Sequence, residues 1–170
     1  RLAPDYAIAH FNLGAALKMK GRLAEASTHL LEALRIEPDF ADAHIEIGNL
    51  MVDRGRPQKA VTHYRQALTL NPDAVDAHFN LAVALSRFGR RREAIEHYLA
   101  VIRIDSGYAQ AHNNLAIAYV RDGNLDEAVS HFREALKINP AYSKASNNLN
   151  RVLMLLKQRE KTSGAKTAPE

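Results

Sequence analysis

The sequence predicts an all-α fold, a solenoid of antiparallel helix pairs (an alpha-alpha superhelix) with four full repeats and a C-terminal capping helix. The first observation behind this prediction is a period of 34 residues, marked by prolines at positions 4, 38, 72 and 140, with Ser106 in the remaining place. The second is that five positions of the repeat hold one residue type in all four units. A fixed period of 20–50 residues is typical of repeat arrays.

Numbering the repeat from Ala7 divides the chain into segments. Residues 1–6 resemble residues 35–40, and we interpret them as the remnant of a preceding repeat, in a chain that is a fragment of a longer array. Four repeats follow at 7–40, 41–74, 75–108 and 109–142. Residues 143–159 repeat the first helix of the unit and are expected to form the capping helix. Residues 160–170 are polar, which predicts a disordered tail.

The first helix of each repeat, helix A, carries small or apolar residues at positions 3, 7, 8 and 11. In repeat two these are Ala43, Ile47, Gly48 and Met51, an apolar stripe at helical spacing. A glycine at position 15 fits a left-handed turn that ends helix A, because glycine accepts a positive φ without steric cost. The four glycines are Gly21, Gly55, Gly89 and Gly123.

The second helix, helix B, carries its own apolar stripe, which in repeat two is Ala60, Tyr64, Ala67 and Leu68. Small residues at position 8 of helix A and position 20 of helix B allow the two backbones to approach closely. A bulky residue at position 24 is expected to fill the space beside them. The proline at position 32 ends helix B, since proline cannot donate a hydrogen bond inside a helix.

These residues resemble the tetratricopeptide repeat family. The shared pattern is Leu or Ile at position 7, Gly or Ala at 8, Gly at 15, Ala at 20, a bulky residue at 24, Ala at 27 and Pro at 32, and it covers about residues 1–156. The sequence departs from it at position 4, which is histidine, and in repeat three at Val101 and Ser106. The resemblance implies a right-handed superhelical solenoid whose concave groove is lined by helix A.

The candidate binding site is the groove face of helix A. Position 6 forms an asparagine ladder, interrupted once by Glu46. An amide both donates and accepts, so it can pair with the backbone of an extended peptide. The pattern resembles the repeat array of O-linked N-acetylglucosamine transferase. The alternative is that asparagine tolerates a half-exposed helix site. The ladder residues are Asn12, Asn80, Asn114 and Asn148.

Two further columns extend the candidate groove. Position 5 holds Phe11, Ile45, Phe79 and Asn113, which either form pockets for apolar side chains or pack half-buried against the neighbouring helix A. Position 13 holds Arg87 and Arg121, whose charge would select the ligand or else belongs to a solvated face.

All eight histidines lie at positions 4 and 23. The sequence predicts that position 4 faces position 27, and that members of one column are about 10 Å apart, the spacing of packed helices. We therefore assign the histidines to packing and expect no metal site and no cofactor. Titration of the two columns near pH 6 is expected to soften the array. The columns are His10, His44, His78 and His112 at position 4, and His29, His63, His97 and His131 at position 23.

The expected function is binding of a protein or peptide, without catalysis. The chain has no cysteine, no apolar run long enough for a membrane, no nucleophile–base arrangement and no glycine-rich phosphate loop. A net charge of +4 is too small for a dedicated nucleic-acid binder. The lack of a signal-peptide pattern slightly favours a cytoplasmic location.

Three alternatives stay open at this point. The chain is a substrate-recognition arm of a larger enzyme such as a glycosyltransferase, it binds RNA as a helical repeat, or it forms a homo-oligomer through the exposed terminal repeat at Leu13 and Leu17.

Overall fold

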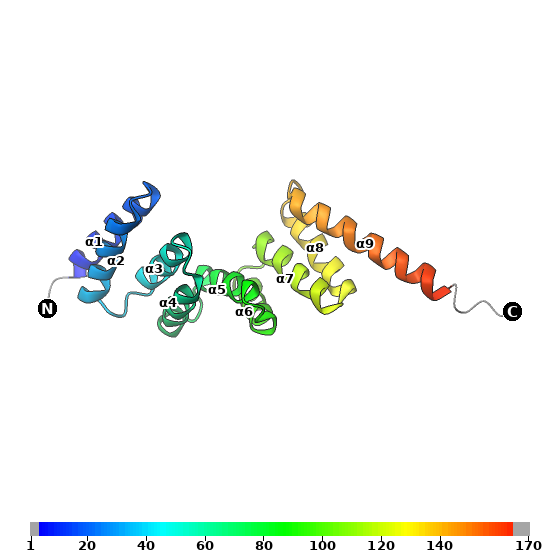
Figure 1. Cartoon of the computed structure of the whole chain (residues 1–170), viewed down its shortest axis with the longest axis horizontal. Coiled ribbons are helices and arrows are strands. Elements are labelled where there is room, and N and C mark those ends of the chain that lie inside the picture. The colour runs from blue at the N-terminus through cyan, green and yellow to red at the C-terminus, as the bar shows by residue number, and fades with distance from the viewer. Residues whose placement is uncertain (1–3, 165–170) are drawn as a thin grey trace. The chain divides into compact units, whose positions relative to one another are not determined.

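The structure is a computed structural model and describes residues 4–164 (Figure 1). Within these residues every regular element is a helix. The helices are α1 (Pro4–Met19), α2 (Leu23–Ile36), α3 (Ala41–Asp53), α4 (Pro57–Leu70), α5 (Val75–Arg87), α6 (Arg91–Ile104), α7 (Ala109–Asp122), α8 (Leu125–Ile138) and α9 (Ser143–Gly164). The four B helices begin 34 residues apart, so the all-α fold of repeated helix pairs is confirmed.

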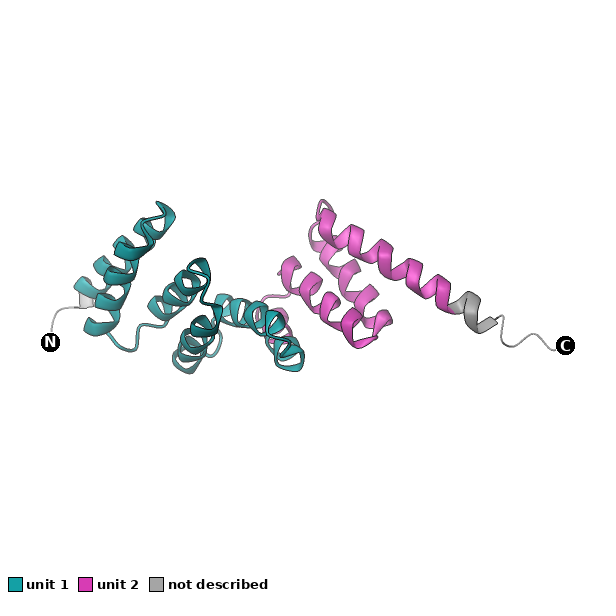
Figure 2. Ribbon diagram, in the orientation of Figure 1, with its two compact units in different colours: residues 1–97 teal, residues 98–170 magenta. Residues whose placement is uncertain are grey.

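The chain divides into two compact units, residues 1–97 and residues 98–170, which we call the N-terminal and C-terminal units (Figure 2). In the N-terminal unit α1 packs on α2, α3 on α4, and each pair on the next; helix A of one repeat also contacts helix A of the following one, as α1 contacts α3 and α3 contacts α5. In the C-terminal unit α7 packs on α8 and both contact α9. The A helices therefore lie next to one another within each unit.

The turn glycines have the conformation that the sequence predicts. Gly21, Gly55, Gly89 and Gly123 have φ of 73°, 70°, 74° and 82°. The amide of Arg22 donates to the carbonyl of Leu17 across the first of these turns, with an N–O distance of 2.9 Å, and Arg56 repeats this bond with Met51. The left-handed glycine thus closes helix A and lets helix B start within three residues.

The close approach of the two helices in a hairpin depends on position 8. A Cβ placed on Gly14 would lie 2.7 Å from Leu30 Cγ and 3.3 Å from the carbonyl oxygen of Ala26. A Cβ on Gly48 would overlap the ring of Tyr64. The small residue at position 8 is therefore required by the bulky residue at position 24, as the sequence predicts.

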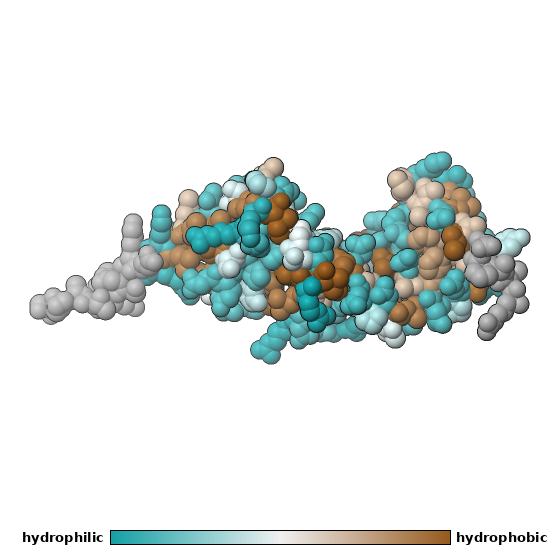
Figure 3. All heavy atoms as spheres, turned by 180° about the vertical axis from the view of Figure 1, so that it is seen from behind, coloured by the Kyte–Doolittle hydropathy of each residue, from teal (hydrophilic) through white to brown (hydrophobic). Residues whose placement is uncertain are grey.

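Each unit has its own hydrophobic core. In the N-terminal unit Leu17, Ala26 and Leu30 pack with Ile47 and Leu50. Leu17 is 6% exposed, so its predicted exposure is wrong, because position 11 faces helix B and the next repeat. Leu13 is 46% exposed and is one of several hydrophobic residues that reach the surface (Figure 3). Association of two copies through this surface stays a prediction.

In the C-terminal unit the core is built around Phe132, between Ala116 of α7 and Val152 of α9. The two ends differ from the predicted segments. Pro4 begins α1, so residues 4–6 form its first turn, at a position where proline is tolerated. Residues 160–164, expected in the disordered tail, are the end of α9, because no helix breaker precedes Gly164. The rest of the tail, 165–170, and residues 1–3 lie outside the described residues.

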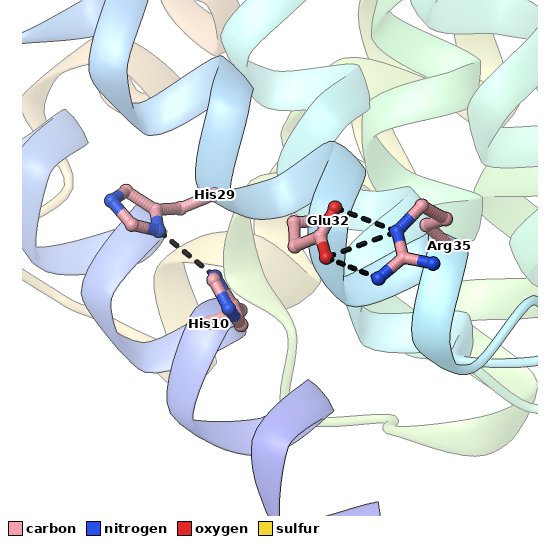
Figure 4. Close-up of polar contacts among 4 residues, drawn as sticks. All are labelled: His10, His29, Glu32 and Arg35. Atoms are coloured by element: carbon pink, nitrogen blue, oxygen red, sulfur yellow. Dashed lines mark hydrogen bonds and ion pairs between the residues drawn. The ribbon is translucent and has the colours of Figure 1, made fainter. Parts of the chain in front are cut away.

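The histidines of the two columns contact each other within every repeat. Figure 4 shows His10 of α1 and His29 of α2 with their rings directed toward one another. Their Nδ1 atoms are 2.9 Å apart. The same pair of atoms is 3.2 Å apart in His44–His63, 2.8 Å in His78–His97 and 3.0 Å in His112–His131. We call these four contacts the histidine dyads.

The dyads correct the predicted register, in which position 4 faced position 27. The carbonyl of Ala26, at position 20, lies next to Gly14, at position 8. The two helices are antiparallel, so a residue one turn before position 8 in helix A lies beside a residue one turn after position 20 in helix B. Position 4 therefore lies beside positions 23 and 24. Counting residues outward from the loop between the helices therefore gives a register that is wrong by about one helical turn.

The proton positions in the dyad of repeat three follow from a carbonyl group. His78 Nε2 lies 2.9 Å from the carbonyl oxygen of Pro72, which can only accept a hydrogen bond, so Nε2 carries the proton. Neutral His78 therefore accepts at Nδ1, and His97 donates its Nδ1–H. Burial lowers the pKa of His97, and the charges of His78 and Arg65 lower it further.

We predict that alanine at Gly48 destabilises the protein by about 1–3 kcal/mol, although alanine favours helix formation, because the new methyl group overlaps the ring of Tyr64. Urea unfolding of Gly48→Ala measures the change. Tyr64→Ala is the matched background, since it removes the ring. Gly48→Ala should be neutral or stabilising there, and an equal loss in both backgrounds would show that the ring is not the cause.

We predict a lower melting temperature at pH 5 than at pH 8. Burial lowers the folded-state pKa of His44, His63, His97 and His131, so folding favours their neutral forms. This stability is present above the unfolded pKa of about 6.5 and is lost as the pH falls below it. Each kcal/mol lost shifts the melting temperature by about 2–4 °C.

Calorimetry at both pH values measures this difference. The control replaces the four position-23 histidines by asparagine, which removes three of the four shifted groups and should reduce the difference between the two melting temperatures. Equal melting of the unmodified chain at pH 5 and pH 8 contradicts the prediction.

Candidate functional site

A hydrogen-bonded network centred on α3 connects this helix with α1, α4 and α5 in the N-terminal unit. Lys18 Nζ of α1 lies 2.5 Å from Glu46 Oε2 of α3, and their side chains are 20% and 22% exposed. Asn49, one turn further along α3, donates its Nδ2–H to the other oxygen of Glu46 at 3.2 Å. Glu46, the residue that interrupts the asparagine ladder, is therefore held by a lysine and an amide.

Two more side chains converge on the oxygen of Asn49. The Tyr64 hydroxyl donates to Asn49 Oδ1 at 2.9 Å, and Asn80 Nδ2 donates to the same oxygen at 3.0 Å. The bond from Asn80 fixes the orientation of its amide. Its Oδ1 and its second N–H are left for another partner. Burial raises the pKa of Tyr64, and the negative charges of Asp53 and Glu46 raise it further, so the hydroxyl stays a donor.

A pocket of about 360 Å³ adjoins this network in the N-terminal unit. Asn80 and Arg87, both predicted site residues, lie in its wall together with Lys18 and Asp53. The remaining lining is Asn49, Val52, Pro57, Tyr64, Val83 and Ala84. The wall thus combines two cations, one carboxylate and two amides with aliphatic side chains, which suits a polar ligand that also has apolar parts.

The C-terminal unit has a second amide chain. Asn148 of α9 donates to Asn113 Oδ1 at 3.3 Å, and Asn113 donates to Asn114 Oδ1 at 3.1 Å. Asn113 is 3% exposed, so it connects the two ladder residues from below the surface. A pocket of about 260 Å³ has Asn148 and Arg121 in its wall. The structure therefore places a ladder asparagine beside a position-13 arginine in each unit.

The other candidate residues divide by burial. Ile45 is 9% exposed and Asn113 is buried, which favours the packing interpretation for these two over a pocket wall. Phe11 is half-buried, with its ring centroid 4.9 Å from that of Phe40. Phe79 is half-buried and Asn12 is exposed on α1.

The repeat pattern does not predict three members of this network. Tyr64 was interpreted only as a space-filling residue, although a buried tyrosine hydroxyl usually requires a partner, which is a usable signal. Asn49 belongs to the groove face by position, but it is unique to repeat two. The ion pair between Lys18 and Glu46 joins two repeats, and the 34-residue period gives no indication of it.

No group of three or more His, Cys, Asp or Glu side chains among the described residues is arranged to hold a metal ion. Arg87, Arg90, Arg91 and Arg92 form a basic cluster around the turn before α6, and Glu93 partly neutralises it through its contact with Arg90, while Arg65 of α4 contacts the same carboxylate. None of the described helices has the length and hydrophobicity to cross a bilayer.

Comparison with known protein families identifies the type of repeat. Family models for the tetratricopeptide repeat match residues 45–109 and 109–142, and a model described as TPR repeat matches residues 18–55. No curated protein sequence matches the chain. The finer likeness to the repeat array of O-linked N-acetylglucosamine transferase stays a prediction.

Solved structures agree on the fold. YrrB, described as a TPR protein with an unusual peptide-binding site, is 26% identical, with a TM-score of 0.74 over 84% of this chain and 73% of YrrB. MamA from Desulfovibrio magneticus RS-1 is 22% identical, with a TM-score of 0.83 over 96% and 92%. PilF of Pseudomonas aeruginosa is 23% identical, with a TM-score of 0.79 over 95% and 73%. The chain belongs to the tetratricopeptide repeat family, a helical scaffold typical of protein–protein interaction.

Proposed function

We propose that the chain binds an extended peptide segment of a partner protein along the groove face of its A helices, and that side-chain amides pair with the peptide backbone. In the N-terminal unit Asn80 makes this contact beside the pocket at Arg87. In the C-terminal unit Asn114 and Asn148 make it beside the pocket at Arg121.

The observation that carries the proposal is the orientation of Asn80. Its Nδ2 is committed to Asn49, so one acceptor and one donor are left on a side chain whose rotation is already restricted. A peptide unit offers a complementary N–H and C=O. Because the amide is held before the ligand arrives, less conformational entropy is lost on binding.

The surrounding charges select the ligand. Lys18 is paired with Glu46, whereas Asp53 and Arg87 are exposed. A peptide with one acidic and one basic side chain on either side of the bound backbone satisfies both. The peptide-binding site named for YrrB supports this class of ligand. Recognition of a substrate by a larger enzyme, the alternative function, would use the same surface, and purification of the endogenous full-length protein decides between the two.

We predict that Asn80→Ala combined with Asn114→Ala weakens peptide binding about 5- to 150-fold, because two hydrogen bonds of roughly 0.5–1.5 kcal/mol each are lost. The probe is a fluorescent peptide selected from a random 12-residue library on the purified chain, and anisotropy gives the affinity. The variant also loses the bonds from Asn80 to Asn49 and from Asn113 to Asn114, so its affinity is measured at a temperature at which circular dichroism shows it to be fully folded.

Two controls make this test specific. Asn150→Ala removes an exposed amide of α9 that the proposed site does not use, and it should leave the affinity unchanged. N-methylation of the peptide backbone should weaken binding more than alanine replacement of any one peptide side chain. Full affinity of the double variant, or insensitivity to N-methylation, would reject backbone recognition by the ladder.

A further inference from the structure

The histidine dyads make no hydrogen bond to the amide network of the proposed site, and they recur in all four repeats. Each dyad brings two imidazole Nδ1 atoms to 2.8–3.2 Å, one from helix A and one from helix B. The ring centroids lie 5.1–5.5 Å apart with interplanar angles of 32–42°. All four repeats thus hold the same arrangement of two strong metal-ligand atoms.

We propose that each dyad is a bidentate site for a divalent late first-row transition metal, with Zn²⁺ as the representative ion. Zn–N bonds are about 2.0–2.1 Å, so two nitrogens on one zinc are separated by about 2.9 Å at a right angle and about 3.4 Å at the tetrahedral angle. The observed separations reach this range without movement of the helices. Only the two rings turn, about the χ2 torsions, which are soft in histidine.

Zinc binding at a dyad conserves the number of bound protons. In repeat three His78 keeps its Nε2–H, bonded to Pro72, and its Nδ1 lone pair is already free for a metal. The proton on Nδ1 of His97 moves through solvent to Nε2 of the same ring, and both Nδ1 atoms then coordinate Zn²⁺. No net proton is released, since both rings are neutral before and after.

The hydrogen bond from His78 Nε2 to the Pro72 carbonyl orients His78, one of the two proposed zinc ligands. A second hydrogen bond that holds the non-coordinating nitrogen is what metal-binding histidines normally have. In repeat two Pro38 occupies the place of Pro72. In repeat four residue 106 is serine, and His112 Nε2 is buried without a partner. The ring of His112 is therefore less firmly oriented, and we expect the dyad of repeat four to bind zinc less tightly than that of repeat three.

Water completes the coordination, because the carboxylates next to two of the dyads are engaged by other partners. Glu32, one turn beyond His29, is engaged by Arg35 in three contacts of 2.6–3.0 Å (Figure 4). Glu134, at the same position of repeat four, pairs with Lys137 at 3.1 Å. The sites are thus weaker than structural zinc sites with four protein ligands, and open to exchange.

Titration of the full chain with zinc chloride at pH 7.5, followed by calorimetry, tests the proposal. We expect four zinc ions per chain, and three in the single variant His63→Asn. Asparagine keeps an N–H near the position of Nδ1, so it can still donate to His44, but it is a poor zinc ligand. Replacement of all four position-23 histidines by asparagine should abolish binding.

Nitrogen NMR of the imidazole rings gives a second readout that does not depend on the variants. Zinc should convert the His97 ring from the Nδ1–H to the Nε2–H tautomer. Absence of zinc binding, four ions retained by the His63→Asn variant, or zinc bound without this tautomer change would each overturn the assignment.

Discussion

The distance between the two helices of a hairpin governs the rest of the structure. Where position 8 is glycine, the bulky residue at position 24 lies directly over its backbone, as Leu30 lies over Gly14. This contact sets the register of helix A against helix B, and the left-handed glycine at position 15 makes the turn short enough to allow it. Because the period is 34 residues, side chains that are identical in every repeat, such as the histidines of the dyads, meet in the same way in each.

The same register determines which side chains reach the groove face of the hairpin. In repeat two the ring of Tyr64 fills the space beside Gly48, and its hydroxyl emerges at Asn49 on the groove face. A residue of the packed interface thereby orients a surface amide, which in turn orients Asn80 of the next repeat. Core packing and ligand contacts are therefore coupled in the N-terminal unit, whereas the C-terminal unit uses a buried amide, Asn113, for the same purpose.

The period was sufficient to predict the helices, the turn glycines and the packing at positions 8 and 24, because these depend on contacts that every repeat makes. It was insufficient for Ile45 and Asn113, since burial at position 5 depends on how closely one helix A approaches the next. It also misplaced the partner of the position-4 histidines, because counting from the turn ignores how the helices cross. The network around Asn49 uses residues that occur once, and no repeated pattern could reveal them.

The histidine columns show why repetition alone does not separate structure from function. A pair that served only for packing would be replaceable by apolar residues of similar volume, and burying imidazoles that favour their neutral form costs stability when the pH falls. Packing explains why both positions are occupied, but it does not require two facing nitrogens in all four repeats. In the metal-free chain the uniform Nδ1–Nδ1 contact is a hydrogen bond, and the same two nitrogens are the donor atoms of the proposed zinc site.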